Sequence, residues 1–424
     1  MKILIVGGGG REHAIAWKLS KENNVEKIYC APGNAGIAKV AQCVNISDSD
    51  IENLVKFAKE NNIDLTVVGP EVPLVNGIVD EFEKEGLKIF GPNKECSTFE
   101  GSKSFSKDFM IRHNIPTAKY KEYTNLDEAI SEIDSFGYPV VIKADGLAAG
   151  KGVVIPENRE DAINTLKEMM SDKKFGSAGD KVVIEEFLSG IETSILAFVD
   201  NDTIVPMVSA KDHKKVYNFE KGPNTGGMGT FSPSEIYTDE LSKEISEKVL
   251  NRTLQGFKKD NLNYKGVLFI GLMITEDGPK VLEYNVRFGD PETQSVLFRL
   301  ETDLHKIMEA ILDNKLKDIE INYKKEEAVC VMLTSGGYPE DYEKGKVITG
   351  LEDLDEDIVV FHSGTKMLDG NLVTNGGRVI GITTSAGSVE EAAKRYIKNI
   401  EKINFEGMHY RTDIGIKFCE EISF

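Results

Sequence analysis

The sequence predicts a multidomain protein that combines the α/β and α+β fold classes. The chain has 424 residues, which suits about two to four domains of ordinary size. Roughly the first 100 residues alternate strand and helix signals, as a doubly wound parallel sheet does. This rhythm changes near residue 102 and again near residue 326. We therefore expect three domains, at residues 1–101, 102–325 and 326–424.

The amino-terminal domain is expected to be a parallel sheet whose strands are joined by helices. We predict strands at 2–6, 27–31, 64–69 and 87–91, and helices at 12–23, 50–61 and 75–86. The second helix, for example, carries Leu54, Phe57 and Ala58 on one face. Right-handed connections of this kind make neighbouring strands parallel.

The central segment predicts an α+β unit with mainly antiparallel strands. Its helices are expected at 102–113, 127–136, 161–170, 239–258 and 303–312, and its strands at 139–144, 152–155, 181–188, 190–200, 203–209, 267–275 and 280–286. The last segment predicts a smaller domain. It should contain strands at 328–335, 345–350, 357–365 and 376–386 and an amphipathic helix at 389–402.

Composition narrows the classes of partner. The net charge is −19 and the isoelectric point about 4.9, which argues against broad binding to nucleic acid or anionic membranes, because phosphate contacts need a basic face. The longest apolar run, 267–274, is too short to span a bilayer. The five cysteines form no CxxC pair, which indicates a reducing compartment, and the six histidines have no metal-binding spacing. We expect a cytoplasmic enzyme without a signal peptide and without a further domain after the third.

The glycine run GGGGREH (7–13) follows the first predicted strand. A dinucleotide site needs GxGxxG and an acid about 20 residues later, but the third glycine position is Glu12, and the second strand ends without an acid. A monophosphate fits better, because bare N–H groups at a helix start attract an anion and Arg11 adds charge. The alternative is a tight turn with a surface arginine.

A second glycine-rich stretch, VIKADGLAAGKG (141–152), is not a Walker A loop, because its spacing differs and no Ser or Thr follows Lys151. A β-hairpin with a tip of small residues can fold over a phosphate chain and exclude water. Lys143 would be a fixed cation on its strand, and Lys103 could be a second. An exposed hairpin with surface lysines is the alternative.

Two strands carry polar side chains that suit a nucleotide. IEEFLSGIETS (184–194) could offer backbone groups to an adenine edge and Glu192 to ribose hydroxyls; a solvated acidic turn is the alternative. In EYNVR (283–287), Glu283, Asn285 and Arg287 share one face, because side chains on a strand alternate. The first two are hard ligands for Mg²⁺ and the arginine can neutralise a transferring phosphoryl group. A half-exposed strand with a polar face is the alternative.

Taken together, these segments resemble the ATP-grasp superfamily and, more closely, the glycinamide ribonucleotide synthetases (phosphoribosylamine–glycine ligases). The resemblance covers nearly the whole chain through eleven segments in order: GGREHAIAWK (9–18), APGNAG (31–36), VGPEVPLVNG (68–77), EGSKSFSKDFM (100–110), IKADGLAAGKGV (142–153), IEEFL (184–188), KDHKKV (211–216), GPNTGGMGTFSP (222–233), EYNVRFGDPETQ (283–294), SGGYPEDY (335–342) and TNGGRV (374–379).

The resemblance implies a fold and a reaction. The fold would be a Rossmann-like amino-terminal domain, an ATP-grasp core with a small hinged lid at about 121–190, and a carboxy-terminal domain. The enzyme would join glycine to 5-phosphoribosylamine with ATP and Mg²⁺ or Mn²⁺, through a glycyl phosphate, in purine biosynthesis. Positioning and charge neutralisation would carry catalysis, since no protein nucleophile is needed.

The resemblance also implies roles for single residues. ATP would be bound by Lys103, Lys143, Gly146, Gly150, Lys151, Gly152, Glu185, Glu186, Phe187, Leu188 and Glu192. Metal ligands would be Glu283 and Asn285, and catalytic groups Arg287, Lys143 and Asp212. The other substrates would meet Gly9, Gly10, Arg11, Glu71, His213, Lys214, Gly226, Gly227, Met228 and Arg287.

One position departs from the wider superfamily, because Gly271 stands where many members have an acid or Gln on the strand before the metal ligands. Phosphate oxygens and water would then complete the metal shell. Two alternatives remain open: another ATP-grasp carboxylate–amine ligase, and a regulatory or scaffold protein with an inactive nucleotide site. The complete set of Lys143, Glu283, Asn285 and Arg287 argues against the latter. We expect small-molecule substrates and a monomer or weak homodimer.

Overall fold

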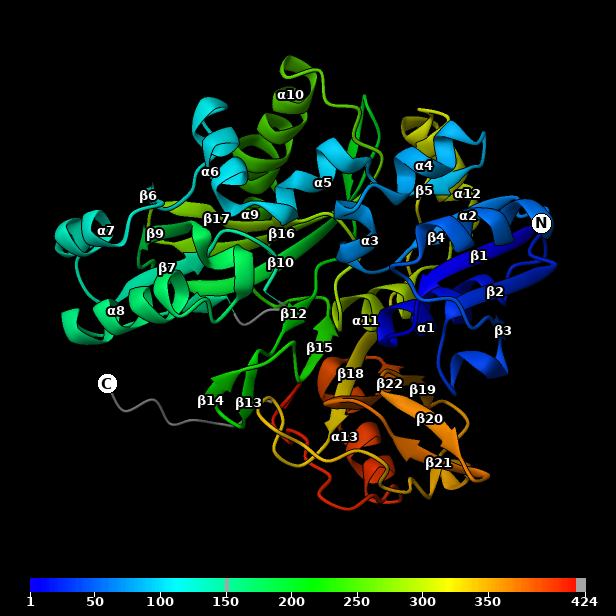
Figure 1. Cartoon of the computed structure of the whole chain (residues 1–424). Helices are drawn as coiled ribbons and strands as arrows, with labels where there is room; N and C mark the ends of the chain where they lie inside the picture. Colours follow the sequence, from blue (N-terminus) through cyan, green and yellow to red (C-terminus); the bar gives the residue numbers. More distant parts are fainter. Residues whose placement is uncertain (149–151, 417–424) are drawn as a thin grey trace.

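The computed structural model describes residues 1–148 and 152–416. Its amino-terminal part is the parallel sheet that the sequence predicts, in the order β3-β2-β1-β4-β5 (Figure 1). The strands are β1 (Lys2–Gly7), β2 (Lys27–Pro32), β3 (Gln42–Cys43), β4 (Leu65–Val68) and β5 (Ile89–Phe90), and the helices are α1 (Gly10–Leu19), α2 (Ile51–Glu60), α3 (Glu71–Val75), α4 (Ile78–Lys84) and α5 (Lys94–Gly101). The strand order reverses between β1 and β4, so the loops after these strands border the crevice where such sheets bind ligands.

The central sheet is antiparallel, as expected, in the order β11-β10-β16-β17. Its strands are β10 (Ile191–Val199), β11 (Ile204–Pro206), β16 (Gly266–Thr275) and β17 (Gly278–Asn285), and the helices of this part are α6 (Lys103–Arg112), α9 (Asp239–Ile245), α10 (Asn251–Lys259), α11 (Glu292–Arg299) and α12 (Leu304–Leu312). The helix predicted at 239–258 is a single run, because a π-helical turn, Ser246–Leu250, joins α9 to α10.

A separate four-stranded antiparallel sheet, β6-β9-β7-β8, lies beside the central sheet and has a hydrophobic core of its own (Figure 1). We call it the lid, because it spans most of the segment 121–190. Its elements are β6 (Tyr120–Tyr123), α7 (Leu126–Glu132), β7 (Val140–Ala144), β8 (Val153–Val154), α8 (Arg159–Leu166), a π-helical turn (Lys167–Ser171) and β9 (Val182–Glu186).

The carboxy-terminal sheet has the order β12-β15-β18-β22-β19. Its strands are β12 (Lys211–Asp212), β15 (Gly229–Ser232), β18 (Glu327–Thr334), β19 (Val359–His362) and β22 (Arg378–Ala386), with helix α13 (Val389–Ile400) and the hairpins β13 (Lys215–Tyr217)–β14 (Lys221–Asn224) and β20 (Thr365–Leu368)–β21 (Asn371–Thr374). Strands β12 and β15 therefore come from the segment that we assigned to the second domain. We keep 1–101, 102–325 and 326–424 as the proposed domain limits. Under these limits, the second domain contributes β12 and β15 to the sheet of the third.

Several expectations are corrected. The strand predicted at 345–350 is wrong, because the segment forms only single bridges, at Val347 and Thr349. The helix predicted at 75–86 is α4, which begins only at Ile78, because Gly77 has a φ of +91° that a helix does not admit; the short helix α3 before it was not predicted. Helix α11 was not predicted; it is buried at every residue and packs against α1, β15, β18 and β22.

The remaining short helical turns are Ile37–Lys39, Ile133–Phe136, Gly176–Asp180, Leu316–Asp318 and Leu351–Asp353. Among the described residues, no helix is both long and apolar enough to cross a membrane.

Candidate active site

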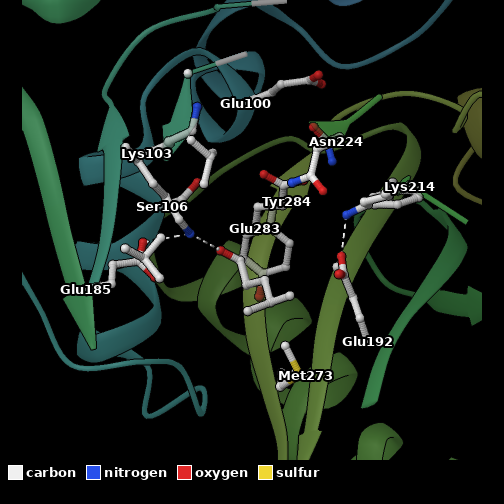
Figure 2. A pocket seen from close by; sticks show the side chains of 18 of the residues that line it. Glu100, Lys103, Ser106, Glu185, Glu192, Lys214, Asn224, Met273, Glu283 and Tyr284 are labelled. Carbon is white, nitrogen blue, oxygen red and sulfur yellow. Dashed lines mark hydrogen bonds and ion pairs between the residues drawn. The ribbon is translucent and has the colours of Figure 1, made fainter. Parts of the chain in front are cut away.

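A cavity of about 350 Å³ lies between the lid, helices α5 and α6, and strands β16 and β17. It brings together most of the site residues that the sequence predicted. Those that line it are Glu71, Lys103, Lys143, Gly152, Glu185, Glu186, Phe187, Leu188, Glu192, Asp212, Lys214, Gly226, Glu283, Asn285 and Arg287. Figure 2 shows Lys103 and Glu185 on one side of the cavity, Lys214 and Glu192 on the other, and Glu283 between them.

Strand β17 forms the floor of the cavity. Glu283 and Asn285 are two residues apart on this strand, so both side chains lie on the face that lines the cavity. Burial by itself would raise the pKa of Glu283. The nearby cations Lys214, Lys143 and Lys103 lower this pKa by more than burial raises it, so the net shift is downward. An ionised carboxylate beside an amide oxygen is a donor pair that fits Mg²⁺ or Mn²⁺. The described residues contain no cluster of three or more His, Cys, Asp or Glu suited to a metal.

The glycine at position 271 has a structural reason. Gly271 pairs with Glu283 across the sheet, and a Cβ at this position would lie 3.3 Å from Glu283 Cγ. A side chain here would crowd the carboxylate that we assign to the metal.

A buried group of three charges lies at the lid side of the cavity. Glu185 Oε1 is 2.8 Å from Lys143 Nζ, and Glu185 Oε2 is 2.8 Å from Lys107 Nζ. Lys107 also donates to Thr117 Oγ1 at 2.7 Å, and Lys143 donates to the carbonyl of Leu282 at 3.2 Å. The Glu185 side chain thus fixes two lysines, in addition to any contact it makes with adenine.

The pKa values in this group follow from burial and pairing. Burial raises the pKa of Glu185, but Lys143 and Lys107 lower it more, so it lies below its usual value. Burial lowers the pKa of Lys107 to about 8, against the opposing effect of Glu185. Our reading of the sequence missed Lys107. Its position in the sequence could have indicated this lysine. Lys107 follows Lys103 by four residues in a predicted helix, and this spacing places both lysines on one helix face.

The segment after β9, which we predict to bind the base, lines one side of the cavity. Phe187 is 40% exposed and Leu188 8%, and both line the cavity together with Val141, Met273 and Leu282. Such an apolar slot suits the faces of a purine ring. Glu186 accepts a hydrogen bond from the Lys119 backbone N–H at 2.9 Å. Glu192, the predicted ribose acid, forms an ion pair with Lys214.

Arg287 is held by two carboxylates from the amino-terminal side. Its guanidinium lies 3.5 Å from Glu71 Oε2 in α3 and 3.0 Å from Glu100 Oε1 in α5. Glu100, which the sequence reading missed, also accepts from the Val286 N–H at 2.8 Å. Burial raises the pKa of Glu100 despite the opposing effect of Arg287. The arginine is thereby fixed where the amino-terminal domain meets β17.

The first glycine loop lies beside this cavity and does not line it. Glu12, which breaks the dinucleotide fingerprint, accepts from the Gly9 N–H at 2.5 Å and pairs with Arg11 Nε at 2.6 Å. Arg11 also donates to the Phe288 carbonyl at 3.1 Å. A Cβ on Gly10 would lie 2.5 Å from Ser363 Oγ and 2.7 Å from Gln294 Nε2. The roles of Gly9, Gly10 and Arg11 stay predictions.

The glycine-rich loop before β15 is tied to the carboxy-terminal domain. Gly226 donates its N–H to the Tyr338 hydroxyl at 2.9 Å, and Arg378 donates to the Gly226 carbonyl at 2.6 Å. Arg378 also pairs with Asp290 Oδ2 at 3.1 Å. The carboxy-terminal domain therefore fixes a wall of the cavity.

Not every predicted residue lies at this cavity. His213 and Met228 are buried in or against the carboxy-terminal core, and burial lowers the pKa of His213 to about 3. We therefore drop both from the proposed substrate contacts. Gly146 packs against Ala178, where a Cβ would lie 2.8 Å from the alanine Cβ. Gly150 and Lys151 lie outside the described residues.

Comparisons with known proteins give matches over nearly the whole chain. Three domain families match the chain: the phosphoribosylglycinamide synthetase N domain at residues 1–100, the ATP-grasp (A) domain at 101–293 and the C domain at 328–417. A phosphoribosylamine–glycine ligase of Caldanaerobacter subterraneus subsp. tengcongensis is 52% identical over 98% of this chain and 99% of its own. One from Halalkalibacterium halodurans is 48% identical over 99% of this chain and 98% of its own.

Solved structures agree as well. The crystal structure of a phosphoribosylamine–glycine ligase from Thermotoga maritima has a TM-score of 0.85 and 35% identity, covering 98% of this chain and 100% of that one. A biotin carboxylase from Campylobacter jejuni has a TM-score of 0.75 at 14% identity, covering 96% of this chain and 92% of that one, which is a likeness of fold alone.

Proposed function

Since the chain belongs to the phosphoribosylglycinamide synthetase family, we infer that it is an ATP-dependent ligase joining glycine to 5-phosphoribosylamine. The products are glycinamide ribonucleotide, ADP and phosphate, in purine biosynthesis. The observation that carries this function is the convergence of Lys103, Lys143, Glu283 and Arg287 on one cavity between lid and core.

We propose these roles for the chain's own residues. Lys103 and Lys143 bind phosphate oxygens of ATP, and the slot beside Phe187 holds the base. A glycine carboxylate oxygen attacks the γ-phosphorus and ADP leaves, while Arg287 neutralises the charge that develops. The lid excludes water, which would hydrolyse the glycyl phosphate. The amine of phosphoribosylamine then attacks the carbonyl carbon, loses a proton, and phosphate leaves.

The enzyme family uses ATP with a divalent metal. We propose that Glu283 and Asn285 hold this ion, which would reduce the negative charge of the ATP phosphates during transfer. Both Mg²⁺ and Mn²⁺ suit the two donors. We further propose a cytoplasmic monomer or weak homodimer that binds no nucleic acid and no membrane.

The direct test is phosphate release from ATP in the presence of Mg²⁺, glycine and freshly prepared phosphoribosylamine. We expect release that requires both co-substrates and yields a product with the mass of glycinamide ribonucleotide. Equal rates with other amino acids, or with another amine, would favour the alternative of a different carboxylate–amine ligase of the same fold.

A further inference from the structure

One lid residue, Asp145, binds the start of helix α6, and we did not predict it for the site. Asp145 follows strand β7 at the beginning of the glycine-rich loop. Its Oδ1 accepts from the Ser104 backbone N–H at 2.6 Å, and its two carboxylate oxygens lie 3.2 and 3.1 Å from the Ser102 hydroxyl. Its backbone carbonyl accepts from the Lys103 N–H at 3.1 Å. A single residue of the lid is thus bonded to three successive residues at the start of α6.

These bonds complete the first turn of α6, because the first N–H groups of a helix have no partner within it. The N–H groups of Lys103 and Ser104 donate to Asp145, and that of Phe105 donates to Ser102 Oγ at 3.2 Å. The first turn of α6, which the structure describes in full, has no acidic residue of its own. Asp145 therefore supplies the negative charge that stabilises a helix start, from 41 positions further along the chain.

The lid in turn fixes Asp145. Its backbone N–H donates to the carbonyls of Ala178 at 3.1 Å and Lys181 at 3.0 Å. Lys181 Nζ lies 3.7 Å from Asp145 Oδ2 and donates to Ser104 Oγ at 3.1 Å. A Cβ on Gly146 would lie 2.8 Å from the Ala178 Cβ, so the chain after Asp145 packs closely against the lid. Since the Asp145 side chain is only 14% exposed, water competes little with these bonds.

Lys103, the first residue of α6, lines the main cavity on the same side as Glu185 (Figure 2). Its ammonium group is close enough to Glu283 to lower the pKa of that carboxyl. Lys143 is held by Glu185, whereas the Lys103 ammonium has no ion-pair partner among the described residues. The place of Lys103 therefore depends on its backbone. Asp145 fixes that backbone but does not itself line the cavity.

We propose that Asp145 is a positioning residue of the reaction, which acts through Lys103 and holds its ammonium group where it meets the phosphates of ATP. The proposal rests on the proposed function, which gives Lys103 its phosphate role. It adds that the lid and this lysine are aligned with each other by one carboxylate. The lid that covers the nucleotide thereby also sets the cation that binds its phosphates.

The first test compares Asp145→Ala and Asp145→Asn with the matched control Glu122→Gln. Glu122 also pairs with Lys181, at 3.5 Å, but lies in β6 and is 55% exposed. Equilibrium binding should show a Kd for ATP with Mg²⁺ that rises about 10- to 30-fold in Asp145→Ala, because two donors at the helix start lose their acceptor and Lys103 shifts. Asp145→Asn keeps an acceptor oxygen, so we expect about 2- to 5-fold, and less than about twofold in the control.

Adenosine separates positioning from a general loss of structure. Lys103 meets phosphate and not the nucleoside, so the Kd for adenosine should stay within about twofold of wild type in all three variants. Circular dichroism confirms that each variant is folded.

The second test asks whether Asp145 acts through Lys103. In a Lys103→Met background, Asp145→Ala should change the Kd for ATP by less than about twofold, because the group that it positions is gone. In a Lys143→Met background the full factor should remain, because Glu185 holds Lys143 independently. If Asp145→Ala does not fold, Asp145→Asn gives the same comparison in each background.

Three results would overturn the proposal: an unchanged Kd for ATP in Asp145→Ala, equal losses for ATP and adenosine, or the full loss in the Lys103→Met background. The last two would mean that Asp145 only stabilises the lid. The proposed function fails separately, if the wild type releases no phosphate with glycine and phosphoribosylamine. The binding comparisons need neither co-substrate, so they decide the role of Asp145 in either case.

Discussion

Replacing Lys107 by methionine removes one of the two cations that Glu185 holds and keeps most of the side-chain volume. Both side chains of the Lys107–Glu185 pair are 2% exposed, and the ammonium also donates to Thr117 Oγ1 at 2.7 Å. The variant leaves Glu185 with Lys143 as its one remaining ion-pair partner among the described residues.

The structure sets the size of the effect. Removing one partner of a buried pair costs about 3–5 kcal/mol when the other charge is left alone. Because Glu185 keeps Lys143, we expect about 1–3 kcal/mol of lost stability. We also expect Glu185 to draw Lys143 away from phosphate, so the KM for ATP rises about 5- to 50-fold with a smaller change in kcat.

The assay combines ATP kinetics with urea unfolding. Lys84→Met in helix α4 is the matched control, since that side chain is 69% exposed and should change stability by less than about 0.5 kcal/mol. An unchanged ATP KM together with unchanged unfolding would refute the role that we give to the three buried charges.

The pH dependence of unfolding gives an independent check. The folded pKa of Lys107 is about 8, below its ordinary value of 10.5, so between these values the unfolded chain binds more protons. Wild-type stability should therefore rise relative to Lys107→Met from pH 8 toward 10.5, by on the order of 1–3 kcal/mol. Glu185 acts in the opposite window: its lowered pKa contributes stability at neutral pH that is lost as the pH falls through the folded value. Unfolding of both proteins at neutral and alkaline pH measures the difference.

Three further substitutions test the site. Glu283→Ala should reduce kcat at least about 100-fold with an unchanged circular dichroism spectrum; substantial activity would remove Glu283 from the metal site. Lys143→Met should raise the Kd for ATP about tenfold or more in equilibrium binding, and an unchanged value would contradict its phosphate role. Gly227→Ala should lower the stability of the fold by about 1–3 kcal/mol, because the added Cβ would clash with Pro291 and Asp212. The same variant should reduce turnover with glycine more than it reduces ATP binding. Thermal melts and glycine kinetics measure these two effects, and wild-type values of both would mean that the loop adjusts freely.

The fold was largely predictable because each element carries its own pattern. The run Ile3–Val6 is fully buried, as its unbroken apolar sequence predicts for a central parallel strand. The prediction of a strand at 345–350 was wrong. Its short apolar alternation is typical of a strand, but no neighbouring strand pairs with the segment along its length. Helix α11 was missed because it is only eight residues long and buries its polar residues together with its apolar ones, so polarity along the sequence does not mark an exposed face.

The candidate site was predictable only where its residues share one strand or loop. Glu283 and Asn285 follow from the period of two in β17, and both line one cavity with Arg287, which lies two residues past the end of the strand. Their partners did not follow. Glu100 lies almost 190 positions from Arg287 in sequence, and nothing local to either residue indicates the other.

The sequence by itself determined the order of elements, the parallel and antiparallel character of the first two sheets, and the polar face of β17, because local periodicity encodes which side of an element is buried. Only the tertiary structure decided that Glu185 holds two lysines, that Arg378 fixes Gly226 and Asp290, and that Asp212 and Glu292 line the same cavity. The physical reason is that the partner of a buried charge depends on which elements pack against it, and that packing joins residues far apart in the chain.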